Sequence, residues 1–135
     1  MSVFVDTSAL LALLDRDEAH HEAAVAIWTR LVLEEAFVST SYVLVETYAL
    51  VQRRLGLDAV RTLAADFVPL IDIDWIGAEV HASAVSALLV AARRDLSLVD
   101  CVSFESMRRR DVRRVFAFDD DFGRQGFEVV RADEP

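Results

Sequence analysis

Four acidic residues of this chain lie in apolar surroundings, where a carboxylate is costly unless a partner binds it. Asp6 ends the run "SVFV", Asp119 ends "RRVFAF", Glu46 interrupts "YVLVETYAL" and Asp100 interrupts "LSLVDCVSFES". Two carboxylates ~4 Å apart repel each other by about 4 kcal/mol at an effective dielectric constant of roughly 20. A hard divalent cation removes this repulsion, and an all-oxygen ligand set favours Mg²⁺ or Mn²⁺. The four acids therefore predict a divalent metal site, provided that the fold brings them together.

Two of these acids also suit a helix cap. Asp6 or Thr7 is placed to cap the apolar helix that follows the first strand, because short polar side chains satisfy the free N–H groups there. Ser97, three residues before Asp100, resembles the first half of a capping box, although glutamate is its usual partner. For Asp6 and Asp100 the sequence leaves capping and metal binding open.

Glu46 and Asp119 have structural interpretations as well. Glu46 is either a ligand or a partly exposed glutamate, flanked at helical spacing by Tyr42, Val43, Ala49 and Leu50. Asp119 is followed by Asp120 and Asp121, and an acidic run after a strand is commonly a solvated turn. Each acid alone is weak evidence, and the coincidence of all four carries the prediction.

The elements that must position these acids alternate between short strands and helices. Strands are predicted at residues 3–5, 36–41, 70–73, 113–118 and 127–130. Helices are predicted at residues 10–14, within 16–36, and at 42–56, 58–67, 76–94 and 98–110, with N-caps at Ser41, Asp74 and Ser97 and a stop at Gly56. This alternation predicts an α/β fold, a three-layer α/β/α arrangement around a mostly parallel sheet of about five short strands. The acids then converge at the edge where the strands end.

Composition favours one compact globular domain, residues 1–135. Hydrophobic residues make up 54% of the chain, with 4 Gly and 2 Pro, which is typical of folded proteins. The charge-free run between Glu79 and Arg93 is shorter than the ~20 residues that a membrane span needs. No basic segment precedes the first apolar run, so no secretion signal is expected. The single cysteine, Cys101, is expected to be buried and inert, and it favours a cytoplasmic location.

Several other chemistries are disfavoured. The three histidines, at positions 20, 21 and 81, have no cysteine at zinc-ligand spacing, and no Gly-rich phosphate loop exists. All 14 basic residues are Arg, which argues against a phospho-receiver domain, because such domains use a Lys at a strand end. The net charge of −9 argues against broad adhesion to nucleic acid. It does not exclude a nuclease whose acids surround a cation.

Two groups of side chains suit contacts with partners. The segment "MRRRDVRR" presents five arginines, either as a solvated helix end or as phosphate contacts. Arg53, two turns beyond Glu46, is the better candidate for a cation that faces a substrate. Trp28 and Trp75 are either core residues or interface residues.

The segments that carry the acids resemble a known family. In order and spacing, "VFVDTSALLALL", "YVLVETYALV", "LSLVDCVSFESM" and "VFAFDDDFGRQGF" resemble the four acidic motifs of PIN-domain ribonucleases, most closely the VapC-type toxins of bacterial toxin–antitoxin pairs. The resemblance covers residues 3–130. It implies that the metal-binding and catalytic acids are Asp6, Glu46, Asp100 and Asp119.

The resemblance also implies supporting roles and contains one departure. Ser8 matches a hydroxyl position that assists the first acid in many members. The family often has Thr or Ser two residues before its fourth acid, where this chain has Ala117. A water or substrate contact is then missing, and either Asp119 or Asp121 serves as the fourth acid.

The activity that the resemblance implies is Mg²⁺-dependent cleavage of RNA, with a 5′-phosphate and a 3′-hydroxyl as products. Asp6 and Asp100 are expected to be the main ligands of one metal, Glu46 a further ligand or the residue that orients the attacking water, and Asp119 the ligand of a second metal or of a water molecule. Whether one metal or two act, and which RNA is cut, stays open. A homodimer and a cognate antitoxin that covers the acids are the implied partners. The alternative is a non-catalytic PIN-like module that binds proteins.

Overall fold

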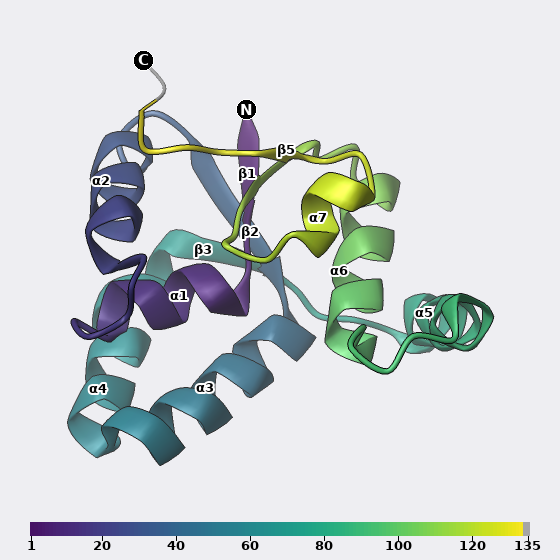
Figure 1. Ribbon diagram of the computed structural model, residues 1–135, viewed down its shortest axis with the longest axis horizontal. Helices are drawn as coiled ribbons and strands as arrows, with labels where there is room; N and C mark the ends of the chain where they lie inside the picture. The colour runs from purple at the N-terminus through teal and green to yellow at the C-terminus, as the bar shows by residue number, and fades with distance from the viewer. Residues whose placement is uncertain (134–135) are drawn as a thin grey trace.

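The computed structural model describes residues 1–133, which form a parallel sheet covered by helices (Figure 1). The strands are β1 (Ser2–Val5), β2 (Ala36–Thr40), β3 (Ile71–Asp74), β4 (Arg114–Phe116) and β5 (Glu128–Val129). The helices are α1 (Thr7–Leu14), α2 (His21–Leu31), α3 (Ser41–Leu55), α4 (Leu57–Thr62), α5 (Ala78–Ala91), α6 (Leu98–Arg109) and α7 (Asp121–Arg124). A π-helical turn, Leu63–Phe67, and a 3₁₀ turn, Val68–Leu70, extend α4. The predicted α/β class with about five short parallel strands is confirmed.

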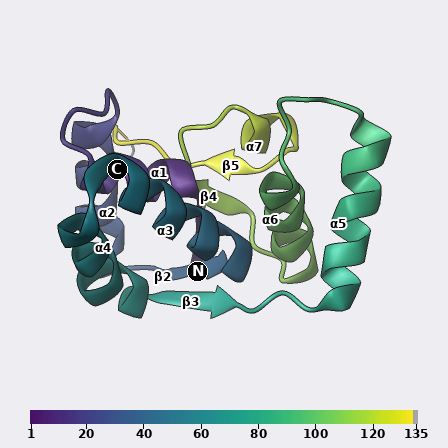
Figure 2. The same cartoon turned by 90° about the horizontal axis from the view of Figure 1, so that it is seen from below.

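The sheet separates two apolar clusters. Side chains alternate along β1, so that Val3 and Val5 face one cluster and Phe4 faces the other. Helices α1 and α2 cover the first face, and α6 and α7 cover the second. Helix α3 contributes to both clusters, through Val51 and Val43 respectively. Figure 2 shows α5 as the outermost element, beside α6. No helix of residues 1–133 is long and apolar enough to cross a membrane.

The order of the strands places the reversal of the sheet topology at β1 and β4. The sheet runs β3-β2-β1-β4-β5, so the chain builds outward from β1 on one side and then returns to the other side. The backbone N–H of Asp6, just beyond β1, donates to the carbonyl of Phe116 at the end of β4 (3.1 Å). Open α/β sheets bind ligands at the carboxyl ends of the strands where this reversal occurs.

Some predicted helix boundaries are confirmed. Ser97 caps α6, because its hydroxyl accepts from the backbone N–H of Asp100 (3.0 Å). Gly56 ends α3 at φ +90°, in a backbone region that is readily open only to glycine. Cys101 is buried, as expected.

The predicted N-cap at Ser41 is wrong by one residue. Thr40 is the cap of α3, and its hydroxyl accepts from the N–H of Val43 (3.2 Å). The Ser41 hydroxyl instead accepts from the N–H of Ile76 (3.0 Å), 35 residues away. A tertiary partner therefore takes the group that the local pattern assigned to the cap.

The predicted N-cap at Asp74 is also wrong. Asp74 is the last residue of β3, and α5 begins at Ala78 after Gly77. The carboxylate of Asp74 accepts from the hydroxyl of Ser106 on α6 (2.6 Å). This hydrogen bond ties the end of β3 to α6, and it removes the side chain from the start of α5.

Candidate metal centre

Three carboxylates converge beyond the carboxyl ends of β1 and β4. One oxygen from each of Asp100, Asp119 and Asp121 lies within 4.8 Å of the other two. They come from the first turn of α6, from the loop after β4 and from the start of α7. We call these three residues the acid cluster. Asp6 adjoins it closely enough for the charges of Asp100 and Asp119 to raise its pKa.

Asp6 is held by the start of α1. Its Oδ2 accepts from the backbone N–H of Ser8 (3.1 Å) and from the hydroxyl of Ser8 (2.7 Å), so Asp6 is the N-cap of this helix. The same hydroxyl accepts from the N–H of Phe118 (3.0 Å), in the loop that leads to Asp119. Within residues 1–133 no hydrogen bond reaches Oδ1 of Asp6. The capping role and a place in the site are therefore compatible.

Asp100 combines the same two roles. Its Oδ2 accepts from the N–H of Ser97 (3.2 Å), which completes a capping box at the start of α6. The cap fixes the position of the carboxylate at the helix N-terminus, where the helix dipole favours negative charge. Capping thus orients Asp100 toward the other acids and does not withdraw it from them.

The three aspartates after β4, residues 119–121, have different environments. Asp119 Oδ1 accepts from the N–H of Asp121 (2.9 Å), and both side chains belong to the acid cluster. Asp120, between them, is exposed. Asp121 is buried, and its Oδ1 accepts from Arg93 (3.0 Å) and from Arg124 (3.4 Å).

Burial disfavours the charged forms of Asp6, Asp100 and Asp119. Burial raises the pKa of Asp6 to about 6; the hydrogen bonds from Ser8 partly offset this rise, and the charges of Asp100 and Asp119 add to it. The pKa values of Asp100 and Asp119 are raised as well, first by burial and then by neighbouring carboxylates. Like charges in a partly dry site favour protonation or a bound cation. The all-oxygen donor set fits a hard divalent ion.

Glu46 lies outside the acid cluster. It is partly exposed on α3 and lines an apolar groove of about 520 Å³, together with Tyr42, Val45, Trp75 and Val99. Its neighbour Thr47 donates to the hydroxyl of Thr7 (3.1 Å), the residue after Asp6. This contact ties α3 to α1 beside the site. No hydrogen bond within the described residues engages the Glu46 carboxylate, and its expected role stays a prediction.

Two arginines contact the acid cluster, whereas the expected role of Arg53 stays a prediction. Arg53 is exposed, and no bonded partner for it is found in the described part of the chain. Arg93 and Arg124, which the sequence did not single out, contact the acid cluster directly. The (i, i+3) spacing of Asp121 and Arg124 was a local signal. The contact of Arg93 with Asp121 spans 28 residues, and no local pattern announces it.

The five arginines of "MRRRDVRR" are all engaged in structural contacts. Their partners are Gln125 for Arg108, Glu105 and Glu79 for Arg109, Asp72 for Arg110, Asp111 for Arg113 and Glu35 for Arg114. The structural interpretation of this segment fits these contacts. The two tryptophans separate, because Trp28 stacks on Phe37 (4.5 Å between ring centroids) whereas Trp75 is 72% exposed.

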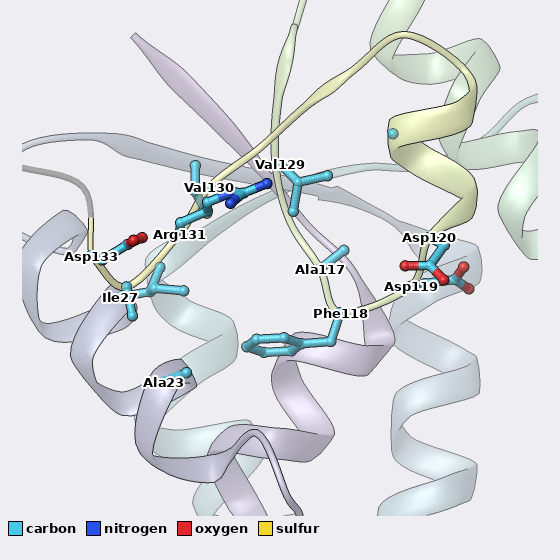
Figure 3. Close-up of a pocket in the computed structure, with 12 residues that line it drawn as sticks. Ala23, Ile27, Ala117, Phe118, Asp119, Asp120, Val129, Val130, Arg131 and Asp133 are labelled. Carbon is cyan, nitrogen blue, oxygen red and sulfur yellow. The ribbon is translucent and has the colours of Figure 1, made fainter.

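A cavity of about 490 Å³ opens beside the acid cluster, and Asp119 lines it. Figure 3 shows Asp119 and Asp120 at one end of this cavity and Asp133 at the other, with Phe118 between them. The cavity combines apolar walls with acidic residues at its ends, and Arg131 also lines it. Ala117 also lines it, at the position where a hydroxyl is missing, and is nearly buried.

Replacing Ser8 by alanine tests the link between α1 and the loop after β4. Ser8→Ala removes a donor to Asp6 and leaves the N–H of Phe118 without its acceptor. We expect the free energy of unfolding to fall by about 1–3 kcal/mol, since a buried group loses its hydrogen bond. Urea unfolding measures this loss, with Thr29→Ala at an exposed position of α2 as the control. Equal stability of the two variants would contradict the proposed link.

Comparison with known proteins identifies a family and relatives of this chain. The model of the PIN domain family matches residues 3–128. The chain is 32% identical over 130 residues to the 23S rRNA-specific endonuclease VapC20 of Mycobacterium tuberculosis, which covers 96% of this chain and 98% of that protein. The crystal structure of VapC20, described as a sarcin–ricin loop cleaving toxin, superposes with a TM-score of 0.86.

More distant solved structures share the fold. VapBC2 of Rickettsia felis, bound to a DNA fragment from its promoter, matches with a TM-score of 0.72 at 12% identity, over 96% of this chain and 98% of that chain. FitAcB of Neisseria gonorrhoeae matches with a TM-score of 0.71 at 17% identity, over 98% of both chains. At these identities the likeness concerns the architecture.

Proposed function

Because the chain belongs to the PIN domain family, we propose that it is a metal-dependent endoribonuclease and the toxin of a toxin–antitoxin pair. The observation that carries the proposal is the convergence of Asp100, Asp119 and Asp121 within 4.8 Å, close to Asp6. Carboxylates that burial and mutual repulsion disfavour are suited to holding a divalent cation.

Asp6, Asp100, Asp119 and Asp121 are the residues that would hold this cation, which we take to be Mg²⁺, with Mn²⁺ as a substitute. When bound, it supplies Lewis-acid stabilisation of the negative charge that develops on the phosphate. The protein holds two of these carboxylates in fixed positions. The caps of α1 and α6 fix Asp6 and Asp100 before any ligand arrives, and preorganised ligands lose little entropy on binding.

Glu46 is proposed to act on the attacking water. Its carboxylate is partly exposed beside the site, which suits a general base that must meet water. As the water oxygen bonds to phosphorus, Glu46 takes a proton from it. The bond between phosphorus and the 3′-oxygen breaks, and the leaving oxygen takes a proton from solvent water, which gives a 5′-phosphate and a 3′-hydroxyl.

The proposed substrate is the sarcin–ricin loop of 23S rRNA. This assignment is supported by VapC20, which is named for 23S rRNA and resembles this chain over 96% of its length. RNA loops present unpaired nucleotides that a compact site can reach. A ribosomal substrate places the proposed activity in the cytoplasm.

RNA digestion by the purified chain tests the proposal. A sarcin–ricin stem-loop RNA is expected to be cut in Mg²⁺ or Mn²⁺, to stay intact in excess EDTA, and to yield ends with a 5′-phosphate. A scrambled stem-loop of equal length is the control for selectivity. Absence of cleavage of the stem-loop and of intact ribosomes in either metal would favour the non-catalytic binding module.

Two partners complete the proposal. The cavity beside Asp119, with apolar walls and acidic ends, suits an antitoxin segment that carries an arginine among apolar residues.

Helix α5 is apolar and largely exposed, with Leu89 73% and Val90 86% accessible. We therefore expect a homodimer that buries α5. Light scattering of the purified chain is expected to give twice the 15.1 kDa monomer mass, and a monomer at all concentrations would contradict the dimer.

A further inference from the structure

Arg93 places a fixed cation at the edge of the acid cluster. It lies in the connection between α5 and α6, and its side chain is 36% exposed. Its Nη2 donates to Oδ1 of Asp121 (3.0 Å), which is a member of the cluster. The guanidinium therefore reaches both the reacting centre and solvent.

Asp95 holds this guanidinium in one orientation. Nε of Arg93 donates to Oδ1 of Asp95 (3.1 Å), and Nη2 donates to Oδ2 (3.0 Å). Such a two-point fork fixes the plane of the guanidinium, which a single contact does not. Asp95 is itself 74% exposed, so it serves to orient Arg93 from outside the cluster.

The remaining end of Arg93 is available. A guanidinium has five N–H donors, and these contacts use the one on Nε and both on Nη2. No acceptor for the two N–H groups of Nη1 is found in residues 1–133. These two donors belong to a guanidinium that Asp95 and Asp121 hold in place beside the acid cluster.

The carboxylates near Arg93 carry more negative charge than one divalent cation offsets. The carboxylates of Asp6 and of the acid cluster carry up to four negative charges, and one divalent cation offsets two of them. An RNA phosphate that enters a chain of net charge −9 needs a positive contact near the reacting bond. Arg124 also touches Asp121, but by one longer contact (3.4 Å) from a side chain that is 62% exposed.

We propose that Arg93 is a substrate-binding residue, which holds a phosphate of the RNA beside the scissile bond through Nη1 while Asp95 and Asp121 orient it. This inference rests on the proposed ribonuclease function and names a contact that the acids themselves do not supply. The fork formed by Nε and Nη2 is occupied by Asp95, and each of the two diverging N–H groups of Nη1 can donate to an anionic phosphate oxygen.

RNA binding measures the contact without turnover. Anisotropy of a labelled sarcin–ricin stem-loop is recorded with Ca²⁺ in place of Mg²⁺ over a series of salt concentrations, and a gel confirms that the RNA stays intact. Arg93→Gln is expected to weaken affinity about tenfold and to reduce the slope of log K against log salt by about one. Arg61→Gln removes the same charge from an arginine paired with Asp58 on α4 and is expected to change neither quantity.

Three further measurements separate geometry from charge. Arg93→Gln is expected to raise KM about tenfold with a smaller change in kcat, and to leave the affinity for Mn²⁺ no weaker. Arg93→Lys is expected to restore the salt slope but only part of the affinity, because lysine keeps the charge and lacks the fork. Arg124→Gln removes another positive partner of Asp121. We expect it to weaken RNA affinity clearly less than Arg93→Gln does.

Different results would contradict the role of Arg93 and the proposed ribonuclease function. RNA affinity and salt slope of Arg93→Gln equal to those of Arg61→Gln or of Arg124→Gln would overturn this inference. So would weaker Mn²⁺ binding with unchanged KM, which would make Arg93 a support of the acids alone. Failure of the wild-type chain to cut RNA would overturn the proposed function and this inference together, whereas normal cutting with any of the former results would overturn only the inference.

Discussion

Asp100→Asn is expected to lower the rate of RNA cleavage in Mg²⁺ by about 10³-fold, which corresponds to a loss of about 4 kcal/mol of transition-state stabilisation. Asparagine keeps an oxygen that can accept from the N–H of Ser97, so the start of α6 is retained. The substitution removes the negative charge that a cation needs from the acid cluster.

Single-turnover cleavage of the stem-loop RNA measures this loss. Asp120→Asn is the matched control, because Asp120 carries the same charge in the same acidic segment but is exposed and outside the cluster. Circular dichroism verifies that both variants are folded. If Asp100→Asn cuts RNA within threefold of wild type, Asp100 is a helix cap and no part of the catalytic site.

Asp6→Asn is expected to stabilise the metal-free protein by about 3 kcal/mol at pH 7.5, an unusual gain for a polar substitution. The pKa of Asp6 is raised from 3.8 to about 6 in the folded state, and each unit corresponds to about 1.4 kcal/mol. A raised carboxyl pKa means that the folded protein binds this proton more tightly than the unfolded chain does. The associated stability is complete below pH 3.8, is lost as pH rises through about 6, and is absent at pH 7.5.

Asparagine is uncharged at every pH and still accepts from the N–H of Ser8, so Asp6→Asn should lack this dependence. Urea unfolding in EDTA at pH 5 and pH 7.5, at constant ionic strength, compares the variant with wild type. The advantage of the variant should shrink at pH 5, where wild-type Asp6 is largely protonated. A variant less stable than wild type at both values would show that the charged cap of α1 outweighs the burial of charge.

A divalent cation is expected to reverse this order. Ligands that bind only the folded state stabilise it by about 2.7 kcal/mol at a concentration of 100 times Kd. Wild type should gain stability in Mn²⁺, and Asp6→Asn should gain much less, since it has lost a carboxylate beside the cluster.

Local patterns account for much of the fold. Short apolar runs that alternate with segments of helical spacing predict the parallel α/β sheet and the type of each main element. The capping box at Ser97 and the stop at Gly56 are also correct, because they join residues within five positions of each other. Asp6 and Asp100 were each given two interpretations, and the structure shows that a cap can also aim its carboxylate at a site.

Residues that meet from distant segments were harder to assign. The acidic run could not show that Asp119 and Asp121 face the cluster while Asp120 faces solvent. Helical periodicity placed Glu46 on an apolar face, but the position of α3 leaves it outside the cluster. No sequence pattern marked Arg93, whose partner is 28 residues away.

The sequence by itself determined which segments are strands and helices and which of them end in acids, because these properties follow from hydrogen bonds and apolar spacing within a few residues. The tertiary structure alone decided which carboxylates lie close together and which arginines contact them. The bond between Ser8 and Phe118 spans 110 residues. Such contacts depend on how β1, β4 and α6 pack, and packing joins segments whose separation along the chain carries no local signal.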